Sequence, residues 1–372
     1  MINSLKLLRS MLSVVLIFLA ASFFTAQGGT VVMGPYLQAV TEHSVKVMVE
    51  SAQTSSITVE YGPDAAYGNK ASTSSIAATT ANPRAYVHCI NLTGLQSGTL
   101  YHYRVDVPGT AGSGHTFYTA SGRGTSFRLA FAADFRTGTA VHDTITARIL
   151  AARPRFLLYG GDLCSSATYK SFKSEFFRAG ETALIAEAPF FNAPGNHEGW
   201  GPNAKAFLQA PASASGTADY YAFDYGDLHV VVINNELLYA KGTAQYNFVA
   251  DDLAKSDRIW KIVISHKPAY SAGGHGGDPG MRVMTDAIFE PAKVDMVISG
   301  HNHYYQHNLV NGIHHLTVGS AGAPLYEPGS AVYTVKSSKS YCYAVIDAAS
   351  SSLTLAVYDE KGVEIERIEL SK

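Results

Sequence analysis

Side chains that can bind a metal ion follow five apolar, strand-like runs of this sequence. The residues after these runs are Asp134, Asp162, Asn196 with His197, His266, and the pair His301 and His303. In open α/β sheets, ligands bind beyond the carboxyl ends of the strands, so we expect these side chains to meet at one place.

The donor types indicate which chemistry this place could support. Carboxylate, amide and imidazole donors without thiolates suit ions such as Zn, Mn or Fe, and not a structural cysteine site. The donors outnumber the ligands that one tetrahedral ion requires, which predicts a binuclear site. Two ions held ~3.5–4 Å apart can clamp both the attacking and the leaving oxygen of a displacement at phosphorus.

The elements that must carry these residues alternate between strands and helices. Strand-like runs include FRLAFAAD, RFLLYGGD, LHVVVINN, WKIVISHK and DMVISGHNH. Between the first two, Val141, Ile145 and Ile149 recur at helical spacing, and further helices are predicted over about 169–185, 243–255 and 281–290. This alternation predicts a layered α/β domain. The strand-like runs after residue 313 are predicted to extend a sheet of the same domain.

Residues 29–120 have a different pattern, with short strands such as HSVKVMVE, AYVHCINL and LYHYRVDV between turn residues. The pattern predicts a small β-sandwich. The piece LTGLQSGTLYHYRV resembles the late strands of a fibronectin type III domain, with Tyr101 or Tyr103 as its corner tyrosine. This part lacks metal-like spacing of His, Asp and Cys, so we expect a spacer or docking module. The Gly-rich residues 121–126 are predicted to link it to a domain at 127–372.

Residues 1–28 are organised like a secretory signal. Lys6 and Arg9 precede an apolar run over 11–24, which is followed by Ala26-Gln27-Gly28. The run is short for a membrane span of ~20 residues, which favours a cleaved signal over an anchor. The mature chain is therefore predicted to begin near Gly29, to be secreted or periplasmic, and to contain no membrane span.

Composition and charge narrow the class of protein further. Hydrophobic residues make up 47% and charged residues 16% of 372 residues, as in a globular protein with a sizeable core. The formal net charge of −2 gives no electrostatic case for binding nucleic acid or an anionic membrane surface. Three cysteines are too few for a disulfide scaffold. Cys89 and Cys342 are predicted to be buried, and Cys164, two residues after Asp162, is predicted to point away from the metal site.

Taken together, the motifs carry a family resemblance. D-x-R at 134–136, G-G-D at 160–162, G-N-H-E at 195–198, a histidine at 266 and G-H-x-H at 300–303 resemble the calcineurin-like metallophosphoesterases in order and spacing. The stretch SHKPAYSAGGHGGD and the preceding β-sandwich resemble the purple acid phosphatase branch and its secreted bacterial relatives. The resemblance implies an N-terminal all-β sandwich followed by an α/β metallophosphoesterase domain, in which two packed sheets are flanked by helices.

The resemblance also implies the metal ligands. Asp162 is expected to bridge two ions. The remaining ligands are expected to divide into Asp134 and His303 for the first ion, and Asn196, His266 and His301 for the second. The ions are expected to be divalent or trivalent, with Fe, Zn and Mn as the candidates.

Three further residues are expected to assist catalysis. The resemblance places His197 against the substrate, where an imidazole beside a dication can donate a proton to a phosphate oxygen. Glu198 is expected to orient His197 or a metal ligand. His275 either reaches the substrate from its Gly-rich loop or is an ordinary surface histidine. In the stretch APGNHEGW, residues 193–200, a sequence typical of a turn thus acquires a function.

Two positions depart from the family pattern. Arg136 stands where the family has a ligating imidazole, and a guanidinium stays protonated and cannot ligate. The purple acid phosphatases have a tyrosine three residues after the bridging aspartate, where this chain has Ser165. These changes predict a weaker, more solvated first metal site without tyrosinate colour. Arg136 is expected to bind the substrate phosphate, and the alternative is an ion pair with Asp134 beside an empty first site.

The leading function is an exported, metal-dependent phosphohydrolase similar to acid phosphatases. It is expected to cleave phosphomonoesters or diesters, in small molecules or on surfaces, by attack of a metal-bound hydroxide. The alternative is a catalytically weakened surface binding or adhesion protein that keeps a metal-binding phosphoesterase fold, motivated by Arg136 and the leading sandwich. A nuclease is disfavoured because the sequence has no basic stripe and no series of stacking aromatic residues.

Overall fold

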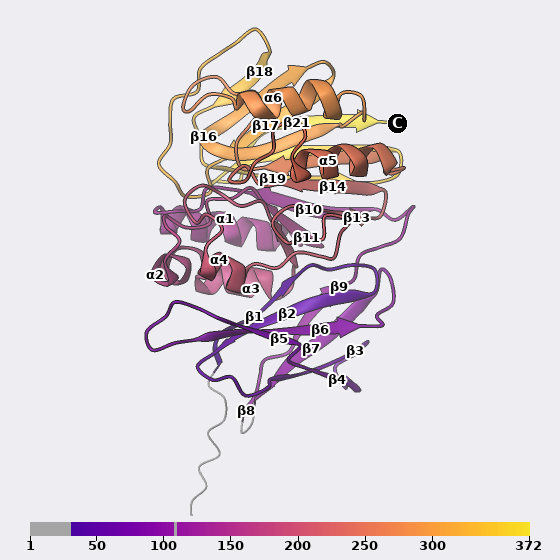
Figure 1. The fold of residues 1–372 in the computed structure, drawn as a ribbon, viewed down its shortest axis with the longest axis vertical. Coiled ribbons are helices and arrows are strands. Elements are labelled where there is room, and N and C mark those ends of the chain that lie inside the picture. The colour runs from indigo at the N-terminus through magenta and orange to yellow at the C-terminus, as the bar shows by residue number, and fades with distance from the viewer. Residues whose placement is uncertain (1–30, 108–109) are drawn as a thin grey trace, which may run out of the picture.

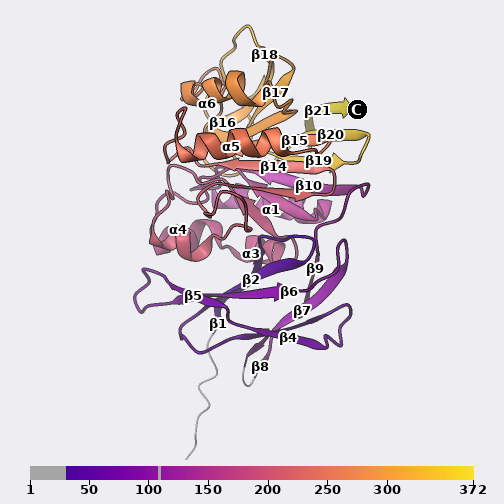
Figure 2. The same cartoon turned by 45° about the vertical axis from the view of Figure 1, so that its right-hand side comes forward.

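The computed structural model describes residues 31–107 and 110–372, so the predicted signal at 1–28 lies outside the described residues. None of the helices in these ranges is both long and apolar enough to cross a membrane. Figures 1 and 2 show the N-terminal strands at one end of the molecule, helices α1–α4 in the middle, and helices α5 and α6 towards the other end.

The N-terminal strands form two layers, as predicted for a β-sandwich. One layer contains β1 (Val31–Gln38), β2 (Ser44–Ser51), β6 (Tyr86–Thr93) and β5 (Ser75–Ala78). The other contains β4 (Asn69–Ser72), β3 (Thr58–Gly62), β7 (Leu100–Val107), β8 (Thr110–Ala111) and β9 (His115–Tyr118). The backbone N–H of Gln96 donates to the hydroxyl of Tyr101 at 3.0 Å, which makes Tyr101 the corner tyrosine.

The first sheet of the α/β part continues directly from the N-terminal strands. Its parallel strands are β10 (Phe127–Ala132), β11 (Phe156–Tyr159) and β12 (Phe190–Asn192), and β19 (Cys342–Ala348), β20 (Ser352–Asp359) and β21 (Glu364–Ser371) extend its far edge. Strand β12 pairs with β1 in parallel at Phe190 and Gln38. The sandwich and the α/β part therefore share one ten-stranded sheet.

The second sheet contains β13 (Tyr221–Tyr225), β14 (Leu228–Ile233), β15 (Trp260–Ser265), β16 (Met296–Val310), β17 (Ile313–Gly319) and β18 (Thr334–Ser338). The strand-like runs predicted after residue 313 are thus divided between two sheets. Strands β17 and β18 join the second sheet beside β16, whereas β19–β21 complete the first.

Alternation along the strands explains the layers. In β10, Leu129 and Phe131 pack between the two sheets, while Ala130 and Ala132 face helix α1 (Thr139–Ala152) and helix α3 (Ala179–Ile185). In β14, Val230 and Val231 divide in the same way between the inner core and the outer helices. Because successive strand residues point to opposite faces, strands that are apolar throughout must be covered on both sides.

The helices cover the outer faces of the two sheets. The outer face of the second sheet packs against α5 (Ala244–Lys255), α6 (Pro279–Met284) and a π-helical turn at Thr285–Phe289. The single helix predicted over 169–185 is instead broken into α2 (Tyr169–Ser171), a π-helical turn at Phe172–Phe176 and α3, and the short helix α4 (Pro202–Phe207) follows β12. Phe172, Phe176 and Phe177, which lie around this break, all enter the core.

Candidate metal centre

The loops after four strands and one irregular strand bring the six predicted ligands to one edge shared by the two sheets. Asp134, Asp162 and Asn196 follow β10, β11 and β12 of the first sheet, and His266 follows β15 of the second. The sequence predicted that His301 and His303 follow the end of a strand. They lie inside β16 instead, because this strand continues through them to Val310. A positive φ of 69° at His301 and a shift of the β17 register between Ser299 and His303 form an irregularity that points both imidazoles into the site.

Backbone geometry holds the two aspartates close together. Asp134 and Asp162 have φ angles of 59° and 51°, in the left-handed region that is costly for residues other than glycine. The N–H of Asp134 donates to the Gly161 carbonyl at 3.0 Å, which ties the two loops to each other. A Cβ on Gly195 would lie 2.4 Å from Asp162 Oδ1, and one on Gly300 would lie 2.4 Å from Asp134 Oδ2. Glycine at these motif positions thus makes room for the carboxylates.

Asp134, Asp162 and His303 form the first group of donors. Each offers an atom within 4.8 Å of the others, and all three side chains are buried. The Nδ1–H of His303 donates to the Pro324 carbonyl at 2.7 Å, so Nε2 presents its lone pair 3.6 Å from Asp134 Oδ1. Burial lowers the pKa of His303 to about 4, which keeps this imidazole neutral near neutral pH. Burial, and next the charge of Asp162, raise the pKa of Asp134 well above its usual value. Two buried carboxylates beside a lone pair are a donor set that fits a cation.

Asp162, Asn196, His266 and His301 form the second group. The Nδ1–H of His266 donates to the Gly160 carbonyl at 2.8 Å, so its Nε2 carries a lone pair. That atom lies 3.0 Å from Asn196 Oδ1, 3.2 Å from His301 Nδ1 and 3.3 Å from Asp162 Oδ1. Ligands bound at ~2.0–2.2 Å around one ion are roughly 3.0–3.5 Å apart, and the three distances from His266 Nε2 fall in this range. Burial lowers the pKa of His301 to about 3, which keeps its lone pair free.

Arg136 lies between the carboxylate of Asp162 and the ring of His303. Its Nε is 3.4 Å from Asp162 Oδ2, and its Nη2 is 3.4 Å from His303 Nε2. The ion pair is therefore with Asp162 and not with Asp134, the partner considered from the sequence. The buried Nε has no hydrogen-bond partner of normal geometry among the described residues. The guanidinium thus has an N–H available for an anion that enters the site.

His197 presents one ring nitrogen to the site. Its backbone N–H donates to Asp162 Oδ1 at 3.0 Å, and its Nδ1–H donates to the Ser165 carbonyl at 3.1 Å. The other nitrogen, Nε2, lies 3.8 Å from Asp162 Oδ2, and the side chain is one-third exposed. When protonated, Nε2 can therefore donate to a group bound at the centre.

Glu198 supports the loop and does not touch the imidazole of His197. It is fully buried, and its Oε1 accepts the N–H of Gly195 at 2.9 Å, which fixes the turn that carries Asn196. Burial, and next the charge of Asp162, raise the pKa of Glu198 to about 8. Of the two roles expected for Glu198, the geometry therefore supports the one towards a ligand.

Ser165 and Cys164 both face away from the ligands. The Ser165 hydroxyl donates to Glu175 Oε1 at 2.5 Å. The buried thiol of Cys164 donates to the Ser166 carbonyl at 3.2 Å, and burial raises its pKa.

Two aromatic contacts in the site were not predicted from the sequence. The ring of Tyr326 stacks on His303 with centroids 4.1 Å apart, and His275 stacks on His301 at 4.6 Å. Asn302 fastens the glycine-rich loop by accepting the His275 N–H at 2.6 Å. His275 therefore belongs to the rim of the site. Tyr326 lies in a loop without a motif, so no sequence signal pointed to it.

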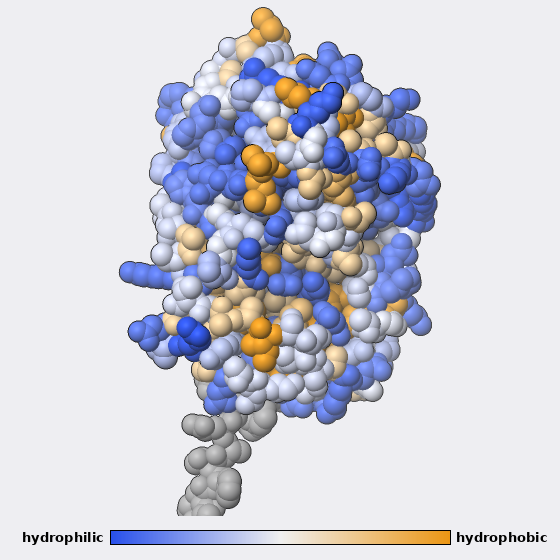
Figure 3. Space-filling model, in the orientation of Figure 1, coloured by the Kyte–Doolittle hydropathy of each residue, from blue (hydrophilic) through white to orange (hydrophobic). Residues whose placement is uncertain are grey.

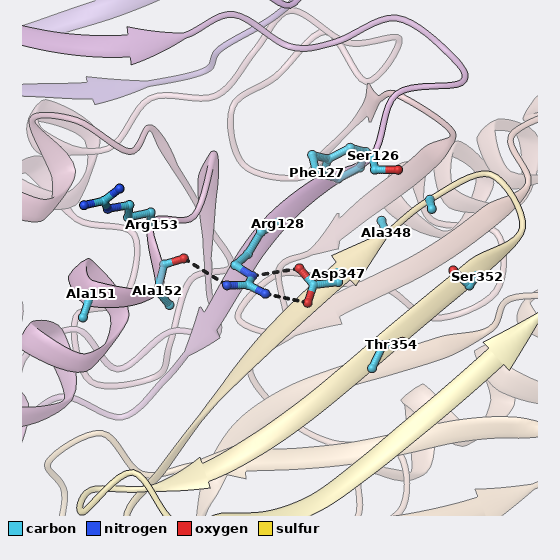
Figure 4. A pocket seen from close by; sticks show the side chains of 11 residues that line it. Ser126, Phe127, Arg128, Ala151, Ala152, Arg153, Asp347, Ala348, Ser352 and Thr354 are labelled. Carbon is cyan, nitrogen blue, oxygen red and sulfur yellow. Dashed lines mark hydrogen bonds and ion pairs between the residues drawn. The ribbon is translucent and has the colours of Figure 1, made fainter.

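A separate surface cavity holds none of the predicted site residues. Arg128 lies in its wall and binds Asp347 through two hydrogen bonds of 2.8 Å, as Figure 4 shows. This cavity lies at the start of β10, whereas Asp134 follows the end of the same strand. Figure 3 shows a largely hydrophilic face with separate, small apolar patches.

Two packed sheets between helices, with carboxylate and imidazole donors converging at their shared edge, define a metallophosphoesterase type of domain. Residues 128–305 match the family model of the calcineurin-like phosphoesterases, and residues 35–127 match that of the purple acid phosphatase N-terminal domain. Residues 128–305 are thus a calcineurin-like phosphoesterase domain, and residues 35–127 are a purple acid phosphatase N-terminal domain, as the motifs indicated.

Individual relatives agree with this assignment. Purple acid phosphatase 22 of Arabidopsis thaliana is 28% identical over 261 residues, which cover 63% of this chain and 58% of that protein. Probable inactive purple acid phosphatase 1 of the same plant is 28% identical over 211 residues, covering 45% of this chain and 34% of that protein. The chain thus spans little more than half the length of the first of these relatives.

A solved structure supports the fold. The purple acid phosphatase PPD1 from yellow lupin seeds superposes with a TM-score of 0.78 at 20% identity, over 91% of this chain and 74% of that chain.

Proposed function

We propose that this protein is a metal-dependent phosphoester hydrolase of the acid phosphatase type. The observation that carries the proposal is the position of Asp162, whose carboxylate lies within 4.8 Å of donor atoms of Asp134 and His303 and 3.3 Å from His266 Nε2 of the other group. Asp162, Asn196, His266 and His301 are proposed to hold an ion, and Asp134, Asp162 and His303 form a second donor group that Arg136 also contacts. When bound, divalent ions supply an activated water nucleophile and neutralise charge on the phosphoryl oxygens.

The residues around the ions divide the remaining work. Arg136 is proposed to donate N–H bonds to phosphoryl oxygens, because its buried Nε lacks a normal partner and a guanidinium fork suits phosphate geometry. His197 is proposed to transfer a proton from Nε2 to the ester oxygen that leaves phosphorus, while the Ser165 carbonyl holds its Nδ1–H. Glu198 is proposed to keep the Asn196 turn in place. Export of the chain by residues 1–28 is part of the same proposal.

The direct test is hydrolysis of 4-nitrophenyl phosphate and of bis(4-nitrophenyl) phosphate by the purified mature chain, with added Mn²⁺, Zn²⁺ or Fe²⁺. We expect metal-dependent turnover that falls by about 10²–10⁴-fold in His197→Ala and is lost in Asp162→Ala. The control His43→Ala alters an exposed histidine of the sandwich and should leave turnover unchanged. Turnover in His197→Ala equal to that of the parent chain refutes this assignment.

The second candidate is a binding protein that has lost catalysis. Arg136 in a ligand position favours it, and one relative carries the name probable inactive purple acid phosphatase. The same assay separates the candidates, because this alternative predicts metal binding without turnover of either ester by the parent chain.

A further inference from the structure

Arg136 touches the very atoms that an ion in the first position would need. The Nδ1–H of His303 is committed to the Pro324 carbonyl, so only Nε2 is available for a metal, and Arg136 Nη2 lies 3.4 Å from it. Asp162 Oδ1 is turned towards His266, which leaves Oδ2 for the first position, and Arg136 Nε lies 3.4 Å from Oδ2. Of the three donors in the first group, His303 and Asp162 therefore already face the positively charged guanidinium of Arg136.

The distances limit how far an ion and the guanidinium could be from each other. An ion bound to His303 Nε2 at ~2.1 Å would lie no more than about 5.5 Å from Arg136 Nη2, because the two distances share one atom. The same limit follows from Asp162 Oδ2 and Arg136 Nε. The side chain of Arg136 is only 15% exposed, so water screens this repulsion poorly.

The second metal position, at Asn196, His266 and His301, is not close to the Arg136 guanidinium in this way. Asn196 and His301 approach His266 Nε2, and the described contacts of Arg136 involve none of these three residues. Asp162 serves both sides, with Oδ1 directed to this group and Oδ2 to the guanidinium. The Asp162 carboxylate thus lies between the second donor group and the Arg136 guanidinium.

We infer that the protein binds one divalent ion tightly, at Asp162, Asn196, His266 and His301, and that the Arg136 guanidinium supplies the positive charge at the other position. The inference rests on the proposed metal-dependent function. Asp162 and His303 then hold the guanidinium in place. A second ion is expected to bind at least about 100-fold more weakly than the first.

The first experiment counts ions with Mn²⁺ as the probe. The mature chain is stripped with a chelator and titrated by calorimetry, and the bound ions are examined by electron paramagnetic resonance. We expect one tight ion per chain and no Mn–Mn coupling. Arg136→His restores an imidazole and should raise the count to two, with a coupled spectrum. Arg136→Lys keeps the charge and should stay at one, as should Arg84→His, a change at an exposed arginine of the sandwich.

The second experiment locates the tight ion. His301→Ala should abolish tight Mn²⁺ binding, whereas His303→Ala should leave one ion per chain. Circular dichroism of each stripped variant confirms that the chain is folded. Two ions of similar affinity in the parent chain, a single ion in folded Arg136→His, or loss of the tight ion in His303→Ala would each overturn the inference. These counts can fail while hydrolysis of the aryl phosphates stands, so the two proposals are judged separately.

Discussion

The two oxygens of Asp162 have different neighbours, and this difference organises the centre. Oδ1 accepts the His197 N–H and faces His266, whereas Oδ2 faces Arg136. Asp162 is almost completely buried, so its charge depends on these neighbours for stabilisation. Arg136 in turn keeps one N–H without a normal partner. Under the proposed function, a phosphoryl oxygen would accept this N–H.

Replacing Arg136 should therefore weaken the recognition of phosphate more than it affects folding. A hydrogen bond to a charged group contributes about 1.5–3 kcal/mol, which corresponds to a fall in kcat/KM of roughly 10–150-fold for 4-nitrophenyl phosphate in Arg136→Ala. Arg136→Lys should recover part of the loss, because it restores charge without the fork. Steady-state kinetics at a fixed Mn²⁺ content measure both values. An unchanged kcat/KM in Arg136→Ala contradicts a role in phosphate binding.

At the scale of elements, short loops after parallel strands and one irregular strand position the donors. Strands β10, β11 and β15 are rigid because both of their faces are buried, and the ligands follow within three residues of each strand end. Polar networks fasten other elements to these strands. His229 in β14 is one example, because its two ring nitrogens lie 2.8 Å from Asp224 of β13 and from Asp252 of α5.

The His229 network should make part of the stability depend on pH. Burial alone would lower the pKa of His229, but hydrogen bonds to Asp224 and Asp252 raise it above the ordinary value. The stabilisation is therefore fully present below the unfolded value of ~6.5 and is lost as pH rises through the raised folded value. Urea unfolding of the parent chain and of His229→Gln from pH 5.5 to 9 should show a difference that shrinks with rising pH. A difference that is constant over this range contradicts the prediction.

At the scale of the whole molecule, the N-terminal sandwich is built into the α/β part. The two share a sheet through β1 and β12, and Tyr103 of the sandwich donates its hydroxyl to the Ala186 carbonyl at 2.6 Å. Lys173, in the π-helical turn, also donates to the buried Glu50 of β2 at 2.5 Å. A single cooperative unfolding transition is expected, because these contacts are buried and cross from one part to the other.

Breaking the ion pair between Lys173 and Glu50 should lower the stability of the protein. Lys173→Met leaves the Glu50 carboxylate buried without its cation, and we expect a loss of roughly 2–4 kcal/mol in the free energy of unfolding. The double variant Glu50→Gln with Lys173→Met should recover much of this loss, since no charge remains buried. Urea denaturation of the single and double variants provides the comparison. A loss no larger than that of an exposed ion pair, below about 1 kcal/mol, would show that the contact does not couple the two parts.

Several features of the fold and site were predictable because they depend on local sequence. Alternating and apolar runs identified most strands around the site, and Val141, Ile145 and Ile149 identified α1, since both periodicities follow from backbone geometry. The region predicted as helical over 169–185 is helical in α2, the π-helical turn and α3, and only the break at Phe177 and Arg178 was not predicted, because it does not follow from the local pattern. Tyr326 escaped notice because its stacking on His303 depends on a loop that returns from twenty-three residues further along the chain.

The sequence by itself determined the types and the order of the donors, because their ability to bind a cation follows from their chemistry. Only the tertiary structure decided how they combine. His301 and His303 lie within an irregular strand, and ligands from two sheets meet at one edge. Arg136 contacts Asp162 and His303, and not Asp134 as considered from the sequence. Distances between residues far apart in the chain depend on how the two sheets pack against each other. The sequence motifs therefore indicate a metal centre, whereas the packing of the two sheets determines which donors the Arg136 guanidinium contacts.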